Sequence, residues 1–156
     1  MQRTSETVPL LYNKEQILDT IPHRDPFVLI DGIVALESRK RCCAVKYIDP
    51  DDRILQGHFP GRPIMPGVHI IENMAQTACF LLASDADEKD NLYVLAKINN
   101  AVFSRKVCGG ETLFTEVAVE RLFDELAIFS GTASVDGVIC AKAGLVVGIN
   151  KREEKK

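Results

Sequence analysis

Two side chains suited to acid–base chemistry lie close together in this sequence, His58 and, fourteen residues later, Glu72. His58 stands within residues 56–67, QGHFPGRPIMPG, whose glycines and prolines would hold the imidazole in one place. A general base needs such fixed placement, and a neutral imidazole can accept a proton at cellular pH. The competing interpretation is that a single loop histidine is structural or simply exposed.

Glu72 belongs to a polar stripe on an otherwise apolar segment. The stripe occupies positions i, i+3, i+4 and i+7, which share one face of a helix: His69, Glu72, Asn73 and Gln76. Because burial disfavours an ionised carboxyl group, Glu72 is expected to remain protonated near neutral pH and to serve as a general acid. The alternative is a stripe that faces solvent or a subunit interface, in which Glu72 is hydrated or ion-paired.

The loop that carries His58 ends at Gly67, where the helix with the polar stripe is expected to begin. Free backbone amides at a helix N-terminus, together with the helix dipole, favour negative charge on a nearby oxygen. A base, an amide donor and a buried acid are the groups needed to remove a proton beside a carbonyl and to expel a β-hydroxyl group.

The elements that must position these groups follow from hydrophobic patterning. Residues 68–84 are apolar around most of a helical circumference, which predicts a buried helix. A capping box at residues 13–16 predicts a short helix to about residue 20, and residues 49–67 predict a long irregular but ordered loop. Five or six antiparallel strands are expected, with an Asp136-Gly137 hairpin turn, over residues 27–36, 42–48, 93–103, 112–122, 125–135 and 138–149.

This pattern predicts the α+β class, with an antiparallel sheet wrapped around one long central helix. The 156 residues, 46% of them hydrophobic, fit a single domain over residues 1–156, with residues 1–7 and 151–156 expected to fray. A formal net charge of −3 and the absence of Trp argue against nucleic acid as a partner.

The sequence also bears on membranes, metals and compartment. No run of about eighteen apolar residues is present, so no membrane span is expected, and the first residues are not expected to be a signal peptide. The five cysteines include no C-x-x-C pair, so neither a zinc site nor a disulfide framework is expected. They are interpreted as small core residues of a protein in the reducing cytoplasm.

Three segments closely resemble the β-hydroxyacyl-acyl carrier protein dehydratases of the hotdog fold, in their short form with a glutamate acid. These segments are residues 22–27 (PHRDPF), 57–67 (GHFPGRPIMPG) and 71–76 (IENMAQ). The similarity extends from about residue 17 to residue 147, and the spacing between His58 and Glu72 is that of the family.

The resemblance implies a role for each matching residue. His58 would take the α-proton of a 3-hydroxyacyl thioester, and Glu72, contributed by the other subunit of a dimer, would protonate the leaving hydroxyl group. The Gly67 amide would hold the thioester oxygen, and Gln76 would orient Glu72. The residues implied to bind substrate are Gly67, Gln76, Phe59 and Pro66.

The implied reaction converts substrates carried on acyl carrier protein to trans-2-enoyl thioesters and water, in fatty-acid biosynthesis or a specialised pathway of that type. It needs no metal or redox cofactor, because the phosphopantetheine arm arrives with the substrate. The family forms homodimers through its sheets, and three dimers often assemble into a hexamer. The resemblance therefore implies a cytoplasmic enzyme with acyl carrier protein as its partner.

Some positions depart from the family pattern. Residues 102–111, VFSRKVCGGE, lack the first arginine and both prolines of the family, which bears on acyl chain length and carrier recognition. His69 and Asn73 replace an aliphatic residue and an alanine, which marks either a specialised acyl substrate or neutral drift. His23 is expected to be structural, in the turn that leads to the first strand.

Two other functions of the hotdog fold compete with the dehydratase. A thioesterase of this fold directs water with an Asp or Glu and lacks the loop around His58. A non-catalytic protein would bind acyl thioesters without needing both His58 and Glu72. Basic residues at 39–41 and 105–106 would either steer an acidic carrier protein or form a solvated face.

Overall fold

The computed structural model describes residues 8–85 and 88–151 of the chain. Its elements in chain order are α1 (Lys14–Leu18), β1 (Gly32–Glu37), β2 (Arg41–Tyr47), α2 (Arg53–Gly57), α3 (Gly67–Ala83), β3 (Leu92–Phe103), β4 (Thr112–Leu122), β5 (Leu126–Val135) and β6 (Val138–Asn150).

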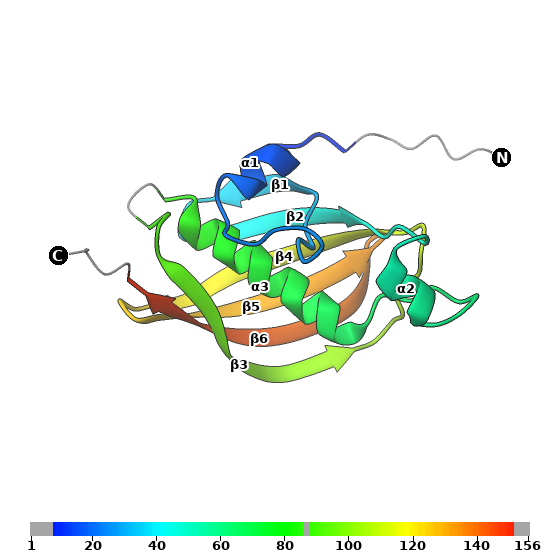
Figure 1. The fold of residues 1–156 in the computed structure, drawn as a ribbon. Helices are drawn as coiled ribbons and strands as arrows, with labels where there is room; N and C mark the ends of the chain where they lie inside the picture. The colour runs from blue at the N-terminus through cyan, green and yellow to red at the C-terminus, as the bar shows by residue number, and fades with distance from the viewer. Residues whose placement is uncertain (1–7, 86–87, 152–156) are drawn as a thin grey trace.

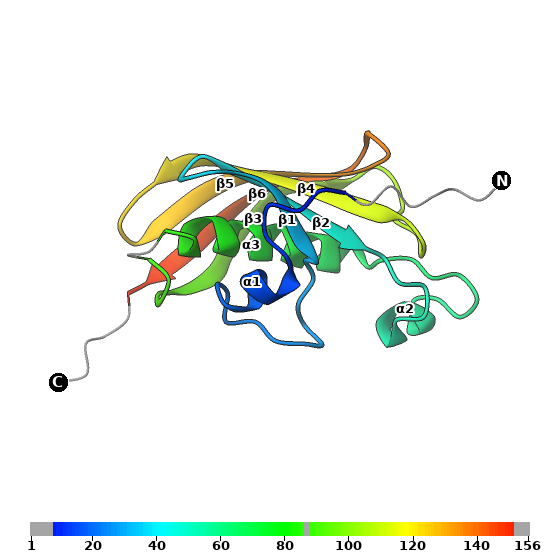
Figure 2. The same cartoon turned by 90° about the horizontal axis from the view of Figure 1, so that it is seen from above.

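The six strands form one antiparallel sheet in the order β1-β2-β4-β5-β6-β3, which makes β1 and β3 its edges. The sheet curves around α3, which runs along one of its faces (Figure 1). The view from above shows the same two layers, with the sheet on one side of α3 and α1 near the other (Figure 2). The predicted α+β hotdog arrangement is confirmed.

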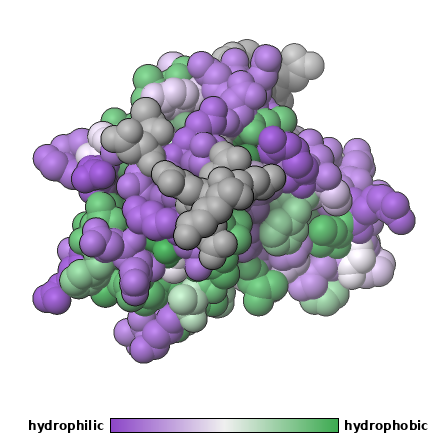
Figure 3. All heavy atoms as spheres, turned by 60° about the vertical axis from the view of Figure 1, so that its left-hand side comes forward, coloured by the Kyte–Doolittle hydropathy of each residue, from purple (hydrophilic) through white to green (hydrophobic). Residues whose placement is uncertain are grey.

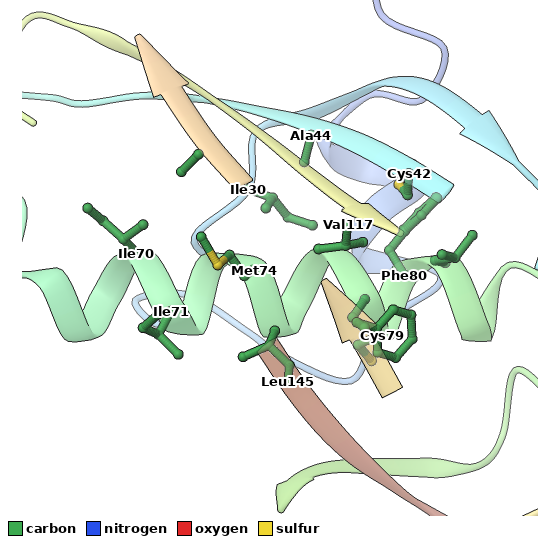
Figure 4. Close-up of a cluster of buried hydrophobic side chains, with 14 of the residues drawn as sticks. Ile30, Cys42, Ala44, Ile70, Ile71, Met74, Cys79, Phe80, Val117 and Leu145 are labelled. Carbon is green, nitrogen blue, oxygen red and sulfur yellow. The ribbon is translucent and has the colours of Figure 1, made fainter. Parts of the chain in front are cut away.

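The core forms where α3 meets the sheet. Twelve of the seventeen residues of α3 are buried, so the helix is central to the fold. Met74 and Phe80 are fully buried in a cluster that includes Val117 and Leu145 of the sheet (Figure 4). A side chain at Gly131 of β5 would come within 2.7 Å of the Met74 sulfur, so glycine there lets the helix approach the sheet.

Residues 28–30, before β1, are buried but do not form a strand. The pattern predicts a strand from residue 27, whereas β1 begins at Gly32. The Leu29 amide donates to the Gln76 side chain at 2.8 Å, and the Leu29 carbonyl accepts from the Asn73 side chain at 2.6 Å. These bonds replace the ladder bonds of a strand, so α3 holds the segment directly.

A short helix, α2, interrupts the loop between β2 and α3, where the sequence predicts irregular structure throughout. Asp52 caps α2 by accepting a hydrogen bond from the Ile54 amide at 2.8 Å, and Leu55 is its buried residue. The prediction is wrong over Arg53–Gly57, because a helix of little more than one turn is too short to show a periodic pattern.

The other predicted elements agree with the structure to within two residues. The capping box of Asn13 and Gln16 opens α1, and the turn at Asp136 and Gly137 joins β5 to β6 with φ values of 49° and 76°. The fraying expected for residues 1–7 and 152–156 lies outside the described residues, whereas Lys151 pairs with Glu88 at 3.3 Å.

The cysteines are core residues only in part. Cys42, Cys79 and Cys140 are buried, and burial raises the pKa of the Cys79 thiol to about 12. Cys43 is partly buried and Cys108 is exposed, so the expectation is wrong for Cys108, which lies in the loop between β3 and β4. In the described part of the chain no helix combines the length and apolarity that crossing a membrane requires.

Candidate active site

His58 directly follows α2, and its ring is fixed from two sides. Its Nδ1 lies 2.8 Å from the carbonyl oxygen of Ile64, and the ring stacks on Phe59 with 4.1 Å between centroids. Because a carbonyl oxygen only accepts hydrogen bonds, Nδ1 of the neutral ring donates and the lone pair is on Nε2. The loop therefore holds the ring so that Nε2 is the nitrogen able to accept a proton.

His58 opens onto a cavity of about 470 Å³ at the N-terminal end of α3. Ligand pockets in proteins have volumes of about 300–1,000 Å³, so the cavity is large enough for a substrate group. The residues that line it come from the His58 loop, the start of α3, and the end of β3 with the loop after it: His58, Ile64, Met65, Gly67, Ile70, Phe103, Ser104, Arg105, Lys106 and Val107.

Gly67 begins α3 at the wall of this cavity. Pro66 precedes it as the N-cap, and within residues 8–85 and 88–151 no side chain caps the helix. The first amides of a helix lack partners within the helix, so the Gly67 amide is available to an oxygen in the cavity. A β-carbon at Gly67 would lie 3.0 Å from the Phe103 ring, so glycine allows the ring to close on the helix start.

Glu72 lies one and a half turns further along α3, in a second group of polar side chains. The Gln76 amide nitrogen donates to Glu72 Oε1 at 3.0 Å and to the Phe27 carbonyl at 2.8 Å, while its oxygen accepts from Leu29. The Glu72 side chain keeps 24% of its surface exposed, whereas Asn73 and Gln76 are buried. The alternative of a stripe facing solvent or a subunit interface is therefore wrong for the two amides, which bind the segment before β1.

The predicted site residues thus fall into two groups within one chain. His58 and Gly67 line the cavity, Phe59 stacks on the His58 ring, and Pro66 caps α3. Glu72 and Gln76 are bonded to each other and do not belong to the described residues that line this cavity. If one active site uses both His58 and Glu72, one of these residues must come from another chain.

His23 lies beside Glu72, a neighbour that the sequence interpretation, which made His23 structural, did not identify. Its Nε2 is 3.8 Å from Glu72 Oε1. Burial lowers the pKa of His23 below its usual value of 6.5, against the opposing attraction of the Glu72 carboxylate, and the Arg24 guanidinium lowers it further. The signal available in the sequence was the PHRDPF segment itself, which contains His23 but does not indicate what the ring contacts.

The loop after β3 is fixed by an ion pair. Arg105 Nη2 lies 2.7 Å from Glu111 Oε1, and the Cys108 amide donates to Glu111 Oε2 at 2.7 Å. Partial burial alone would raise the pKa of Glu111, but the hydrogen bonds from Arg105 and Cys108 hold it below its usual value. Lys106, which is exposed, and Arg105 place two cations at the wall of the cavity.

In the second basic cluster, at residues 39–41, each side chain pairs with a carboxylate, as Arg105 does in the first. Arg39 pairs with Asp85 at 3.0 Å, and both Lys40 and Arg41 pair with Glu37. This cluster lies between β1 and β2 and does not line the cavity with His58. Of the two clusters, only the one at residues 105–106 is positioned to meet a molecule that enters the cavity.

Within the described ranges, no group of three or more His, Cys, Asp or Glu side chains is arranged to hold a metal ion.

Comparisons with known proteins bear on this site. The profile of the FabA-like domain matches residues 21–144. The chain is 36% identical over 146 residues to the 3-hydroxyacyl-acyl-carrier-protein dehydratase FabZ of Polynucleobacter necessarius, an alignment that covers 94% of this chain and 98% of that protein. It is 41% identical over 134 residues to the protein of the same name from Geotalea uraniireducens, covering 83% and 91%.

A solved structure shows the same fold. The dehydratase heterocomplex ApeI:P from Xenorhabdus doucetiae superposes with a TM-score of 0.76 at 18% identity, covering 88% of this chain and 91% of that chain. The family profile spans most of the sequence, and the FabZ relatives align over nearly their whole lengths. This chain therefore belongs to the family of FabA-like domains.

Proposed function

We propose that this chain dehydrates 3-hydroxyacyl thioesters carried on acyl carrier protein, in fatty-acid biosynthesis or a pathway of that type. The products are a trans-2-enoyl thioester and water. The observation that carries the proposal is a histidine held as a base, with Nδ1 bonded to the Ile64 carbonyl at 2.8 Å, at a cavity that also contains the start of α3. The FabZ relatives carry the name of this reaction.

The groups act in a defined order. His58 Nε2 takes the proton from the carbon beside the thioester carbonyl, whose oxygen gains negative charge and accepts a hydrogen bond from the Gly67 amide. The carbon–oxygen bond at the β-carbon then breaks, its electron pair leaves with the hydroxyl group, and the Glu72 proton converts that group to water. Phe59 and Pro66 fix the base and the helix start, and Gln76 orients Glu72. None of these steps requires a metal or redox cofactor.

The acid comes from a second copy of the chain in this proposal. Glu72 does not line the His58 cavity of its own chain, within the described residues, so the partner of a homodimer would supply it. The edge strand β3 is twelve residues long and exposes Leu92, Val94, Ile98 and Val102, which is a suitable surface for pairing. Hydrophobic residues also reach the surface on the lower side of the molecule in Figure 3, the side on which β3 lies in Figure 1.

The partner that delivers substrate is acyl carrier protein. Its acidic surface and phosphopantetheine phosphate complement Arg105 and Lys106 at the cavity wall. The acyl chain and thioester enter the cavity, while the carrier protein stays outside. A cytoplasmic location, where such carriers meet their enzymes, completes the proposal.

Mixing two inactive variants tests the shared site. His58→Ala and Glu72→Gln are each expected to lower 2-enoyl thioester hydration, followed by absorbance, at least about a hundredfold. After exchange of subunits in a 1:1 mixture, about half of the dimers are mixed and carry one intact site of two, so about a quarter of wild-type activity returns.

Native mass spectrometry of differently tagged chains shows whether subunits have exchanged. Restored activity supports an acid and a base from two chains. If subunits exchange but activity does not return, the acid and the base of one site lie on the same chain. If either single variant is fully active, the residue substituted in it takes no part in the reaction.

A further inference from the structure

His23 has an unusual set of neighbours for a histidine in a turn. It lies between α1 and β1, and its Nδ1 is buried without a hydrogen-bond partner among the residues the structure describes. Its other nitrogen, Nε2, faces Glu72 Oε1 at 3.8 Å. One ring nitrogen is therefore enclosed, and the other is directed at the carboxyl group that the proposed reaction uses as its acid.

The position of the ring proton follows from these neighbours. A proton on Nδ1 would leave a buried donor without an acceptor, whereas an unpaired lone pair there costs less. Glu72 Oε1 already accepts a hydrogen bond from Gln76 at 3.0 Å, so it presents lone pairs, and a second lone pair on Nε2 would repel them. Both considerations place the proton on Nε2, directed at Glu72.

We propose that His23 is a positioning residue for Glu72, a role that rests on the proposed function of Glu72 as the acid. The N–H groups of His23 and Gln76 both point toward Oε1 of Glu72, so this oxygen remains the hydrogen-bond acceptor of the carboxyl group. The acidic proton is then carried by Oε2, the oxygen for which the described residues provide no hydrogen bond. His23 in this way selects which oxygen of Glu72 meets the leaving hydroxyl group.

The contact strengthens as the reaction proceeds. At 3.8 Å it exceeds the length of a normal hydrogen bond. When the proton leaves, Oε1 becomes part of a carboxylate, and hydrogen bonds to a charged acceptor are shorter and about twice as strong. An interaction that is stronger after proton transfer than before it lowers the barrier and does not merely tighten substrate binding.

The surroundings keep His23 uncharged in this role. The ionisable groups next to the pair are Arg24, which follows His23 in the turn, and Cys79, two turns after Glu72 on α3. Burial and Arg24 both disfavour a protonated His23 ring. A permanent positive charge beside Glu72 would favour loss of its proton before substrate binds, so a neutral donor suits an acid better than a lysine or arginine.

Three substitutions separate positioning from packing. His23→Leu removes the N–H group at similar volume, His23→Gln keeps an amide N–H near the position of Nε2, and His23→Asn places its amide near Nδ1. We expect kcat to fall about tenfold to a hundredfold in His23→Leu and His23→Asn with little change in KM, and to stay within about threefold in His23→Gln. The basic limb of the kcat profile should shift to higher pH in the first two, because a donor that stabilises the carboxylate is gone.

The controls distinguish this inference from the proposed function. His69→Gln is the matched control, because His69 lies one turn before Glu72 and lines a separate small cavity, and it should keep the wild-type profile. In a Glu72→Gln background, His23→Leu should cause no further loss. Active Glu72→Gln would overturn the role of Glu72 itself. Two outcomes would overturn only the role of His23, provided that Glu72→Gln is inactive. One is a wild-type kcat and pH profile in His23→Asn, and the other is an equal loss of activity in His23→Gln and His23→Asn.

Discussion

The Gln76 side chain holds both Glu72 and the segment before β1 in place. Its nitrogen donates to Glu72 and to the Phe27 carbonyl, and its oxygen accepts from the Leu29 amide. The side chain is fully buried, so no water replaces these partners when it is removed. One amide thus connects α3 to the segment before β1.

Replacement of Gln76 by leucine should therefore cost both stability and activity. The buried Leu29 amide loses its partner, and such a loss costs about 1–3 kcal/mol. The bond to the Phe27 carbonyl, which is only partly buried, is lost as well. We expect the free energy of unfolding, measured by urea denaturation, to fall by at least about 2 kcal/mol, with lower dehydratase activity in the folded fraction. Asn73→Ala, which removes a single bond to Leu29, is the control and should cost less. Equal losses would show that the additional bonds of Gln76 contribute nothing to stability.

Residue types and spacing predicted most of these side chains but not all their contacts. His58, Glu72 and Gln76 stand in segments whose pattern is visible along the chain, and a helical repeat places Glu72 next to Gln76. The contact between His23 and Glu72 joins a turn to a helix almost fifty positions later, and no local pattern specifies it. Asn73 is likewise explained by its bond to Leu29, which favours a structural origin over a specialised acyl substrate.

At the scale of elements, the loop between β3 and β4 forms one wall of the cavity. The Arg105–Glu111 pair closes this loop, and the Cys108 amide adds a second bond to the Glu111 carboxylate. The loop also pairs with the segment before α3, since the Met65 amide donates to the Val107 carbonyl at 2.8 Å. Loss of the carboxylate should therefore disturb the cavity wall without touching His58.

Glu111→Gln tests this arrangement. Removing the charge weakens the bonds to Arg105 and Cys108, so we expect KM for enoyl thioesters to rise severalfold while kcat changes less. The pKa of Glu111 lies below its usual value of 4.5, so the ionised carboxylate stabilises the folded protein above pH 4.5. This stabilisation is lost as the pH falls through the lowered pKa of the folded protein. The difference in thermal stability between wild type and variant should accordingly shrink below pH 4.5. Glu120→Gln, on the exposed surface of β4, is the matched control; a KM change as large as that of Glu111→Gln would contradict the assignment.

The elements that sequence patterning missed are those whose bonds are not local. Residues 27–30 look like a strand because they are apolar, yet the Phe27 carbonyl and both backbone groups of Leu29 bond to side chains of α3. Helix α2 contains too few residues for a repeat to be visible. The long strands and α3 were predicted closely because each extends over several repeats of its own period.

At the scale of the whole molecule, the sheet leaves one long edge free. β3 pairs with β6 on one side, and no other strand of the described chain borders it. Its exposed apolar residues include Val94, Ile98 and Val102. Strand order and the free edge result from pairing between distant segments, which is why the sequence predicted the antiparallel strands around α3 but not their order in the sheet. The proposed dimer uses this edge to bring the Glu72 of one chain to the His58 of the other.

Ile98→Lys should weaken that dimer and its activity together. Two-fold symmetry places the new lysine on both sides of the interface, so a single substitution buries two positive charges near each other. We expect the dimer dissociation constant, measured by analytical ultracentrifugation, to rise at least about a hundredfold. Activity per chain should fall at low protein concentration and recover as concentration rises, because each site needs both chains. Val138→Lys, an equally exposed apolar position at the start of β6, should leave both quantities unchanged. A monomeric Ile98→Lys protein with full activity would show that one chain contains a complete site.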